Sequence, residues 1–336
     1  MSESISDNNI YAKLGLSIPV NEREIIIRNL IEIHKTDTLF AEGGKCSNVP
    51  LKVYPNRYFL AQNFDKKKED MRNALREAFE NYNLSVITVD EEIGGALFCN
   101  IASMILGTPF GIYHIDKEQK TNVYLELGVS IGLQKPFILV KDHNASIANV
   151  LEFIQYYEMN DYFSLSETLG SLTDDYITRV GYFDKALIQN ATARTREVCV
   201  SLGELETEDI GVTLAIQLVK RGYQPVFLCE MNKKLAKFLE QKEIEPIFYH
   251  KIPEVSDAIA RSKFGVYRVD NSASSNSFIY LGIAIGLNRP TLMINNEREK
   301  APSDLSIFDA LKFAGRTDLE EKFELAFPKW EERFLE

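Results

Sequence analysis

The chain has little of what marks metalloproteins, disulfide scaffolds or membrane proteins. Its four cysteines include no CxxC pair, and its four histidines lie far apart with no HExxH. We therefore expect no zinc site and no disulfide framework. No apolar run is long enough to cross a bilayer. The first residues, MSESISDNNIY, lack a basic segment followed by an apolar one, so we expect no secretory signal and a cytoplasmic protein with reduced thiols.

Positive charge is also scarce. Against 49 acidic residues stand 38 lysines and arginines, which gives a net charge of −11. Binding to nucleic acid requires a basic surface because the phosphates must be neutralised, so direct nucleic-acid binding is disfavoured. The 336 residues, 45% hydrophobic and 26% charged, are typical of a soluble globular protein with two domains.

Strand-like and helix-like segments alternate from residue 57 onward. The strand-like segments are RYFLAQNF (57–64), LSVITVD (84–90), PFGIYHID (109–116) and KPFILVKD (135–142). Between them, apolar residues recur at helical spacing. This alternation predicts right-handed crossovers and a mostly parallel sheet with helices on both faces.

The pattern restarts near residue 195, and part of the first half recurs there. Residues 110–136 align with 264–290 without a gap, and eleven of the twenty-seven positions are identical. We therefore predict a tandem duplication of one doubly wound α/β domain. The expected boundaries are an N-terminal appendage (1–56), two α/β domains (57–180 and 195–298) and a helical C-terminal tail (299–336).

The two copies differ at a position that bears on chemistry. TNVYLELGVSIGLQKPFILV, at 121–140, carries Glu126 among apolar residues, whereas SNSFIYLGIAIGLNRPTLMI, at 275–294, carries Tyr280 at the same place. The fold does not require the acid, because the second copy manages without it. Glu126 is then either a helix-dipole acid in the first turn or a catalytic carboxylate beside a crevice.

Polar residues gather where the expected strands end. Ligands of open α/β sheets bind beyond the carboxyl ends of the strands, so these residues are expected to line one crevice together with the start of the following helix. The candidates are Gln62, Asn63, Phe64, Asp90, Asp116, Asn122 and Glu126. Ordinary roles are open to them as well, as turn, cap or core residues. His114 becomes Arg268 in the second copy, so we expect it at the surface.

Three segments together resemble the nucleoside 2-deoxyribosyltransferase-like and TIR-like nucleotide-binding proteins of bacteria: YFLAQNFD, VDEEIGG and GIYHIDKEQKTNVYLELGVSIGLQKPFILVKD. The Asp–Asn–Glu–Gly spacing carries the resemblance, over about residues 57–180 and more weakly in the second half. It implies a flavodoxin-like or TIR-like doubly wound parallel sheet. Asn63 departs from the family, which has a proline there, and Gln134 replaces a common glycine.

The resemblance also implies roles for the candidate residues. Glu126 would attack or stabilise the anomeric carbon of a ribose, and Asp116 would contact the sugar. Gln62, Asn63 and Phe64 would line the base or phosphate site. The resemblance further implies a homo-oligomer and a role in bacterial defence.

The chemistry fits that assignment, because cleavage of an N-glycosidic bond builds positive charge that a carboxylate can stabilise or trap. Nicotinamide leaves without a proton, whereas another base would need a donor such as Asp90 or Asp116. We therefore expect an N-ribosyl hydrolase or transferase acting on NAD or a related nucleotide or nucleoside, as substrate and not as cofactor, without a metal. The second copy, with Tyr280, is expected to be inactive. The alternatives are a non-enzymatic nucleotide sensor and a purely structural interaction protein.

Overall fold

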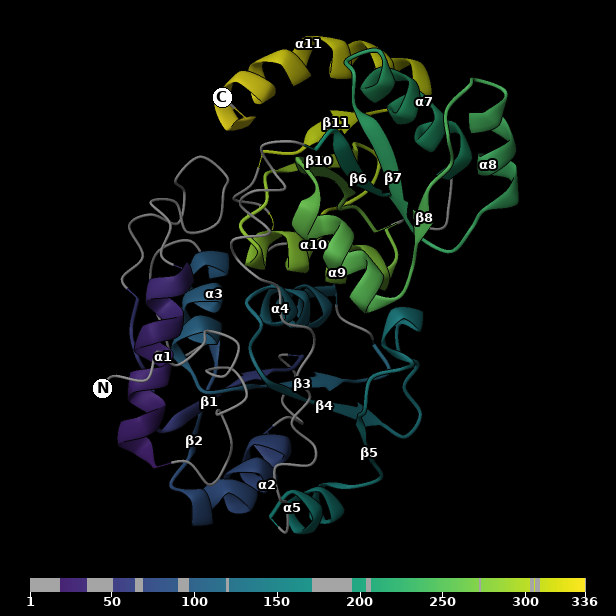
Figure 1. The fold of residues 1–336 in the computed structure, drawn as a ribbon. Helices are drawn as coiled ribbons and strands as arrows, with labels where there is room; N and C mark the ends of the chain where they lie inside the picture. The colour runs from purple at the N-terminus through teal and green to yellow at the C-terminus, as the bar shows by residue number, and fades with distance from the viewer. Residues whose placement is uncertain are drawn as a thin grey trace. The chain divides into compact units, whose positions relative to one another are not determined.

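The computed structural model describes residues 19–34, 51–63, 69–89, 97–118, 121–170, 195–203, 207–271, 273–302, 305 and 309–335. The chain divides into two units. One holds the described residues up to 170 and the other those from 195 onward (Figure 1).

The first unit is built on a five-stranded parallel sheet. Its strands are β1 (Arg57–Ala61), β2 (Ser85–Ile87), β3 (Gly111–Ile115), β4 (Phe137–Asp142) and β5 (Tyr157–Met159), in the order β2-β1-β3-β4-β5. Phe59 pairs with Gly111, and Gly111 pairs in turn with Phe137. This is the flavodoxin-like strand order, whose direction reverses between β1 and β3. The expected doubly wound α/β fold is confirmed.

Helices cover both faces of this sheet. They are α1 (Val20–His34), α2 (Glu69–Phe79), α3 (Leu97–Gly107), α4 (Thr121–Gly132) and α5 (Tyr162–Gly170), with short 3-10 turns η4 (Glu80–Tyr82) and η6 (Asn149–Leu151). α2 and α5 lie together on the face that presents Leu60, Ile112 and Val140. α3 and α4 lie together on the opposite face (Figure 1).

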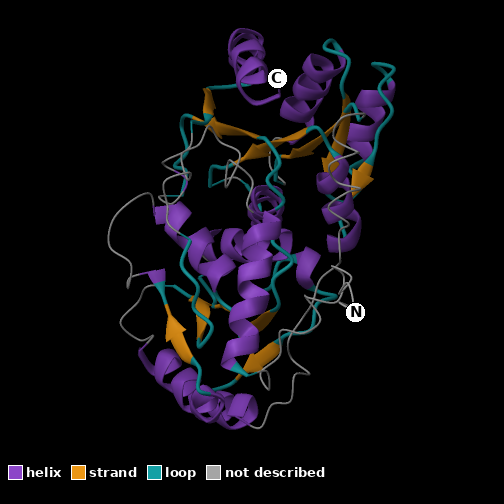
Figure 2. Cartoon of the chain, turned by 60° about the vertical axis from the view of Figure 1, so that its left-hand side comes forward, coloured by secondary structure: helices purple, strands orange, loops and turns teal. Residues whose placement is uncertain are grey.

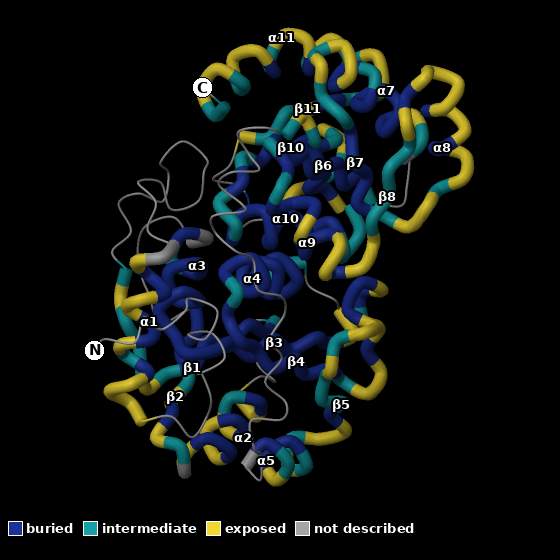
Figure 3. Tube along the Cα trace, in the orientation of Figure 1, coloured by how far each residue is buried: buried dark blue, intermediate teal, exposed yellow. Residues whose placement is uncertain are grey.

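α1 belongs to the first unit, although it lies in the segment that we expected to be an appendage. It packs on α3 and buries Ile27 and Leu30 completely. Figure 3 shows the central strands β1, β3 and β4 buried, while the outer side of α1 is exposed. Burial of such an apolar stripe contributes roughly 1.5–3 kcal/mol per large side chain.

The second unit has six parallel strands. They are β6 (Glu197–Ser201), β7 (Gln224–Leu228), β8 (Phe248–Tyr249), β9 (Phe264–Arg268), β10 (Thr291–Asn296) and β11 (Leu311–Phe313). The order is β11-β10-β9-β6-β7-β8. Numbered within the unit, this is the 3-2-1-4-5-6 order of Rossmann-type sheets. The two units therefore share a local repeat but differ in sheet topology.

The helices of the second unit are α7 (Thr207–Val219), α8 (Lys233–Glu240), α9 (Ile252–Arg261), α10 (Ser275–Gly286) and α11 (Arg316–Leu335). α7, α8 and α11 share one apolar core with the sheet. α9 and α10 contact each other over the opposite face. Figure 2 shows helices on both sides of this sheet. Residues 299–336, which we expected to form a helical tail, contain the strand β11 as well as α11.

The repeated segment folds alike in both units. α4 corresponds to α10 and β4 to β10, and both pairs of elements begin and end 154 residues apart. One identical pair has a visible packing reason. A side chain on Gly111 would meet the ring of Tyr113 at 2.6 Å, and one on Gly265 would meet the ring of Tyr267. Folding alone thus explains these shared residues.

One expectation about the cysteines was wrong. Cys99 on α3 is disulfide-bonded, whereas Cys199 and Cys229 are free thiols. A sequence without closely spaced cysteines gives no sign of such a bond, because it depends on which segments the fold brings together. Within the described part of the chain, no helix is both long enough and apolar enough to cross a membrane.

Candidate functional site

The ends of β1 and β3 are joined by a small polar network. The side-chain amide nitrogen of Asn63, two residues past β1, donates to Asp116 Oδ2 at 3.1 Å and to Glu118 Oε2 at 2.7 Å. The backbone nitrogen of Glu118 donates to Asp116 Oδ1 at 3.0 Å. β1 and β3 flank the point where the strand order reverses, which is where open α/β sheets bind ligands. The structure thus brings Asn63 and Asp116 together there.

Glu126 lies on α4 and is turned inward. Only 5% of the residue is exposed. Its carboxylate is close enough to the Tyr113 hydroxyl to act on the pKa of that group. Burial raises the pKa of Tyr113, the neighbouring Ser130 hydroxyl lowers it, and the charge of Glu126 raises it again. A carboxylate in this position is shielded from bulk water, so its charge acts on neighbours more strongly than at a surface.

The remaining predicted residues divide into two groups. Gln62, at the end of β1, is buried, and Asn122, in the first turn of α4, is half-buried. Phe64 and Asp90 lie outside the described residues. Among the described residues, no three histidine, cysteine, aspartate or glutamate side chains are grouped so that they could hold a metal ion.

The expectation that His114 lies at the surface was wrong. His114 is 3% exposed, and its Nε2 lies 2.7 Å from Asp142 Oδ1 on β4. Its counterpart Arg268 is 1% exposed and pairs with Asp270 at 2.8 Å. Every residue of both strands, β3 and β9, is buried up to the carboxyl end. A polar residue there is therefore buried, and it needs a partner to offset its desolvation.

Further acids gather around this end of the sheet. The pKa of Tyr162 on α5 is raised by burial and then by the charges of Asp142, Asp70 and Asp116. These three carboxylates come from β4, from α2 and from the residue after β3. Sequence reasoning found Asp116 but missed Asp142 and His114. The only available signal was that the pair His114 and Asp142 is replaced by Arg268 and Asn296 in the repeat.

In the second unit the equivalent residues are arranged differently. Tyr280, which takes the place of Glu126, is 1% exposed, and its hydroxyl donates to the carbonyl oxygen of His250 at 3.1 Å. Asp270, equivalent to Asp116, is fully buried. It accepts from Arg268 and, at 2.8 Å, from the backbone nitrogen of Asn296. These residues hold the interior of the second unit together.

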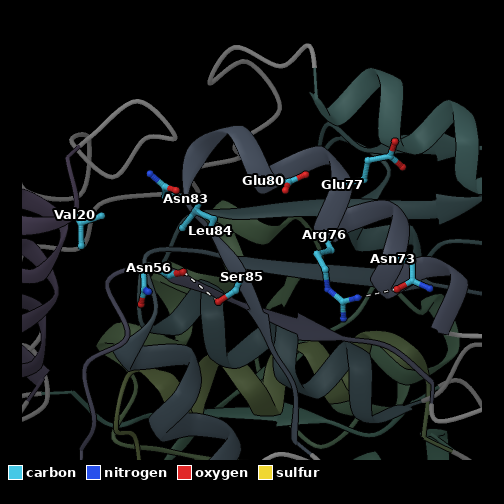
Figure 4. A pocket seen from close by; sticks show the side chains of 9 residues that line it. All are labelled: Val20, Asn56, Asn73, Arg76, Glu77, Glu80, Asn83, Leu84 and Ser85. Atoms are coloured by element: carbon cyan, nitrogen blue, oxygen red, sulfur yellow. Dashed lines mark hydrogen bonds between the residues drawn. The ribbon is translucent and has the colours of Figure 1, made fainter.

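A separate hollow of about 670 Å³ opens at the amino-terminal edge of the first sheet (Figure 4). Its lining residues are Val20, Asn56, Asn73, Arg76, Glu77, Glu80, Asn83, Leu84 and Ser85. Nearly all of these side chains are exposed. Arg76 Nη1 donates a hydrogen bond to Asn73 Oδ1 at 3.0 Å. None of the sequence-predicted site residues lines this hollow, which is a shallow surface depression at the edge opposite to them.

Comparisons with known proteins place the chain in no family. No family model matches it, and no curated protein matches it. Among solved structures it is similar to an S. aureus MnaA–UDP co-structure. The sequences are 10% identical, the match covers 83% of this chain and 90% of that chain, and the TM-score is 0.33. A likeness at that level carries no argument about the site.

Proposed function

We propose that the first unit is an N-ribosyl hydrolase or transferase that cleaves the N-glycosidic bond of NAD or a related nucleotide or nucleoside. The observation that carries the proposal is the placement of Glu126. It is an acid with 5% exposure on α4, the helix that follows β3 and contacts both β1 and β3. The repeat replaces it by tyrosine, so it is not needed for folding.

In this reaction the bond between C1′ and the base nitrogen breaks, and its electron pair leaves with the base. Glu126 either attacks C1′ to form a glycosyl ester or stabilises the positive sugar. Water, or the hydroxyl or ring nitrogen of an acceptor, then takes the sugar and frees the carboxylate. Asp116 contacts the sugar, and Asn63 and the backbone of Glu118 fix the orientation of Asp116.

A nucleotide sensor is the second candidate. Both carboxylate oxygens of Asp116 already accept a hydrogen bond. A carboxylate whose orientation is fixed in this way can bind a ligand without taking part in a reaction, as well as contribute to catalysis. The homo-oligomer and the role in defence remain predictions from the resemblance, and light scattering of the purified chain tests the first of them.

Incubation with substrates separates the two functions. The wild-type chain and the Glu126→Gln variant are each incubated with NAD and, separately, with ribo- and deoxynucleosides, and released base is measured by chromatography. Release by the wild type that is lost in Glu126→Gln supports the enzyme. Tight binding without release, measured by calorimetry, supports the sensor. Equal release by both proteins would contradict the assignment of Glu126.

A further inference from the structure

We propose that His114 is a positioning residue. By pairing with Asp142 on the next strand, it leaves the Asp116 carboxylate at the end of β3 for Asn63 and a ligand. This inference rests on the proposed function, because it concerns the acid expected to contact the sugar. It also explains why the same acid in the second unit is buried out of reach.

The strand registers define which residues are equivalent. Phe59 pairs with Gly111 in the first sheet, and Cys199 pairs with Gly265 in the second. Because Gly111 and Gly265 are the same position of the repeat, β1 is equivalent to β6 at an offset of 140. Asn63, four residues past Phe59, therefore corresponds to Gly203, four residues past Cys199. Gly203 has a φ of 83° and no side chain that could hold an acid.

In the second unit the acid pairs with the last residue of the strand that precedes it. Arg268 Nε donates to both oxygens of Asp270, at 2.8 and 2.9 Å. The two side chains are 1% and 0% exposed. A buried ion pair of this kind is costly to break, because separating it leaves a desolvated charge. The Asp270 carboxylate is therefore held in a buried ion pair inside the second unit.

In the first unit two substitutions change this arrangement. Histidine replaces arginine at position 114, and Asp142 replaces the asparagine found at 296. The imidazole turns to the new carboxylate across the sheet, at 2.7 Å. Asp116 is bonded instead to Asn63 from β1, and it retains 9% exposure where Asp270 has none. The acid is thereby held at the reversal point of the sheet.

Several acids lie near the carboxyl ends of β3 and β4. Asp142 on β4, Asp116 directly after β3 and Asp70 on α2 all raise the pKa of Tyr162 on α5. A larger, permanently charged guanidinium at position 114 would find a carboxylate two residues further along the chain, as Arg268 does. The shorter imidazole makes its contact with the neighbouring strand instead.

The test is the full-length His114→Arg variant, with His114→Gln as its matched control. In the crystal structure of His114→Arg, the guanidinium is expected to bind Asp116, and the bond between Asn63 and Asp116 is expected to be lost. The kcat/KM on the substrate cleaved by the wild type is expected to fall by about tenfold to a hundredfold, which corresponds to one charge-assisted hydrogen bond. The lower kcat/KM should result mainly from a higher KM. His114→Gln, whose amide nitrogen lies where Nε2 of the histidine lies and can still donate to Asp142, should retain most of the activity.

The outcomes separate this inference from the proposed function. If the wild type cleaves no substrate, the proposed function fails, and the variant crystal structure still tests the positioning role. A His114→Arg structure that keeps the bond between Asn63 and Asp116 would overturn the inference. So would an unchanged KM in His114→Arg, or an equal loss in both variants accompanied by the same fall in melting temperature.

Discussion

The hydroxyl of Tyr280 donates a 3.1 Å hydrogen bond to the carbonyl oxygen of His250, at the helix position where the first unit carries Glu126. Burial raises the pKa of Tyr280 well above that of a free tyrosine, so the group stays neutral. Its hydrogen bond connects α10 to His250, two residues before the start of α9. The same position of one repeat is thus structural in one unit and bears a buried carboxyl group in the other.

Tyr280→Phe should destabilise the second unit by about 1 kcal/mol, because it removes one hydrogen bond and leaves a carbonyl without its donor. The ring would still fill its place. Trp330, the only tryptophan of the chain, packs on Phe264 and Phe327 of this unit. Its fluorescence during urea unfolding therefore reports the change. Cleavage activity should be unaffected, and a large loss of activity would contradict the division of roles.

Gly111→Ala and Gly265→Ala should each destabilise their own unit by roughly 1–3 kcal/mol, because the added methyl group overlaps a tyrosine ring that cannot move in a packed core. The overlapping rings belong to Tyr113 and Tyr267. Amide hydrogen exchange in β3 measures the first effect, and Trp330 fluorescence measures the second. If neither substitution lowers the stability of its unit, contact with the tyrosine ring is not the reason why both copies carry glycine.

Lys135 should make the stability of the first unit depend on pH. It is 1% exposed, its Nζ donates to the Leu106 carbonyl at 3.2 Å, and burial lowers its pKa from 10.5 to about 7. Below pH 7 the lysine is charged in both states, and the folded state carries the full cost of burying it. Between about pH 7 and 10.5 the unfolded state binds more protons, so stability rises with pH.

Lys135→Met removes this titration. The stability difference between the variant and the wild type should change by at most about 1.4 kcal/mol per pH unit, in favour of the wild type as pH rises. Hydrogen exchange of α3 and β4 at several pH values measures it, and other titrating groups cancel in the difference. A difference that stays constant from pH 7 to 10 would contradict the lowered pKa of Lys135.

The local parts of this fold were predictable from sequence, since they depend on periodicity. Strands and helices alternate where the apolar pattern changes, and the offset of 154 is reproduced by α4 and α10. Asn63 and Asp116 could be expected at one edge because parallel strands end together. The strand order of the first unit was implied only by the family resemblance, and the Rossmann-type order of the second unit was not predicted, since strand order depends on pairings between distant segments. β11 was missed because three residues, Leu311–Phe313, are too short to show a strand pattern.

The residues with which charged side chains pair could not be predicted from the sequence either. The substitution of histidine for arginine at position 114 suggested a tolerant surface, yet both residues are buried. The residue that each one pairs with depends on side chains from a neighbouring strand. No spacing rule in a single sequence gives that information.

The central claim is that the Glu126 carboxylate meets the sugar carbon of a bound nucleotide or nucleoside. The most direct measurement is the kcat of Glu126→Gln on the substrate cleaved by the wild type, with Glu77→Gln on the exposed side of α2 as the matched control. We predict that kcat falls at least about a thousandfold, some 4 kcal/mol of barrier, while binding and the control are little changed. Full activity in Glu126→Gln would contradict the account.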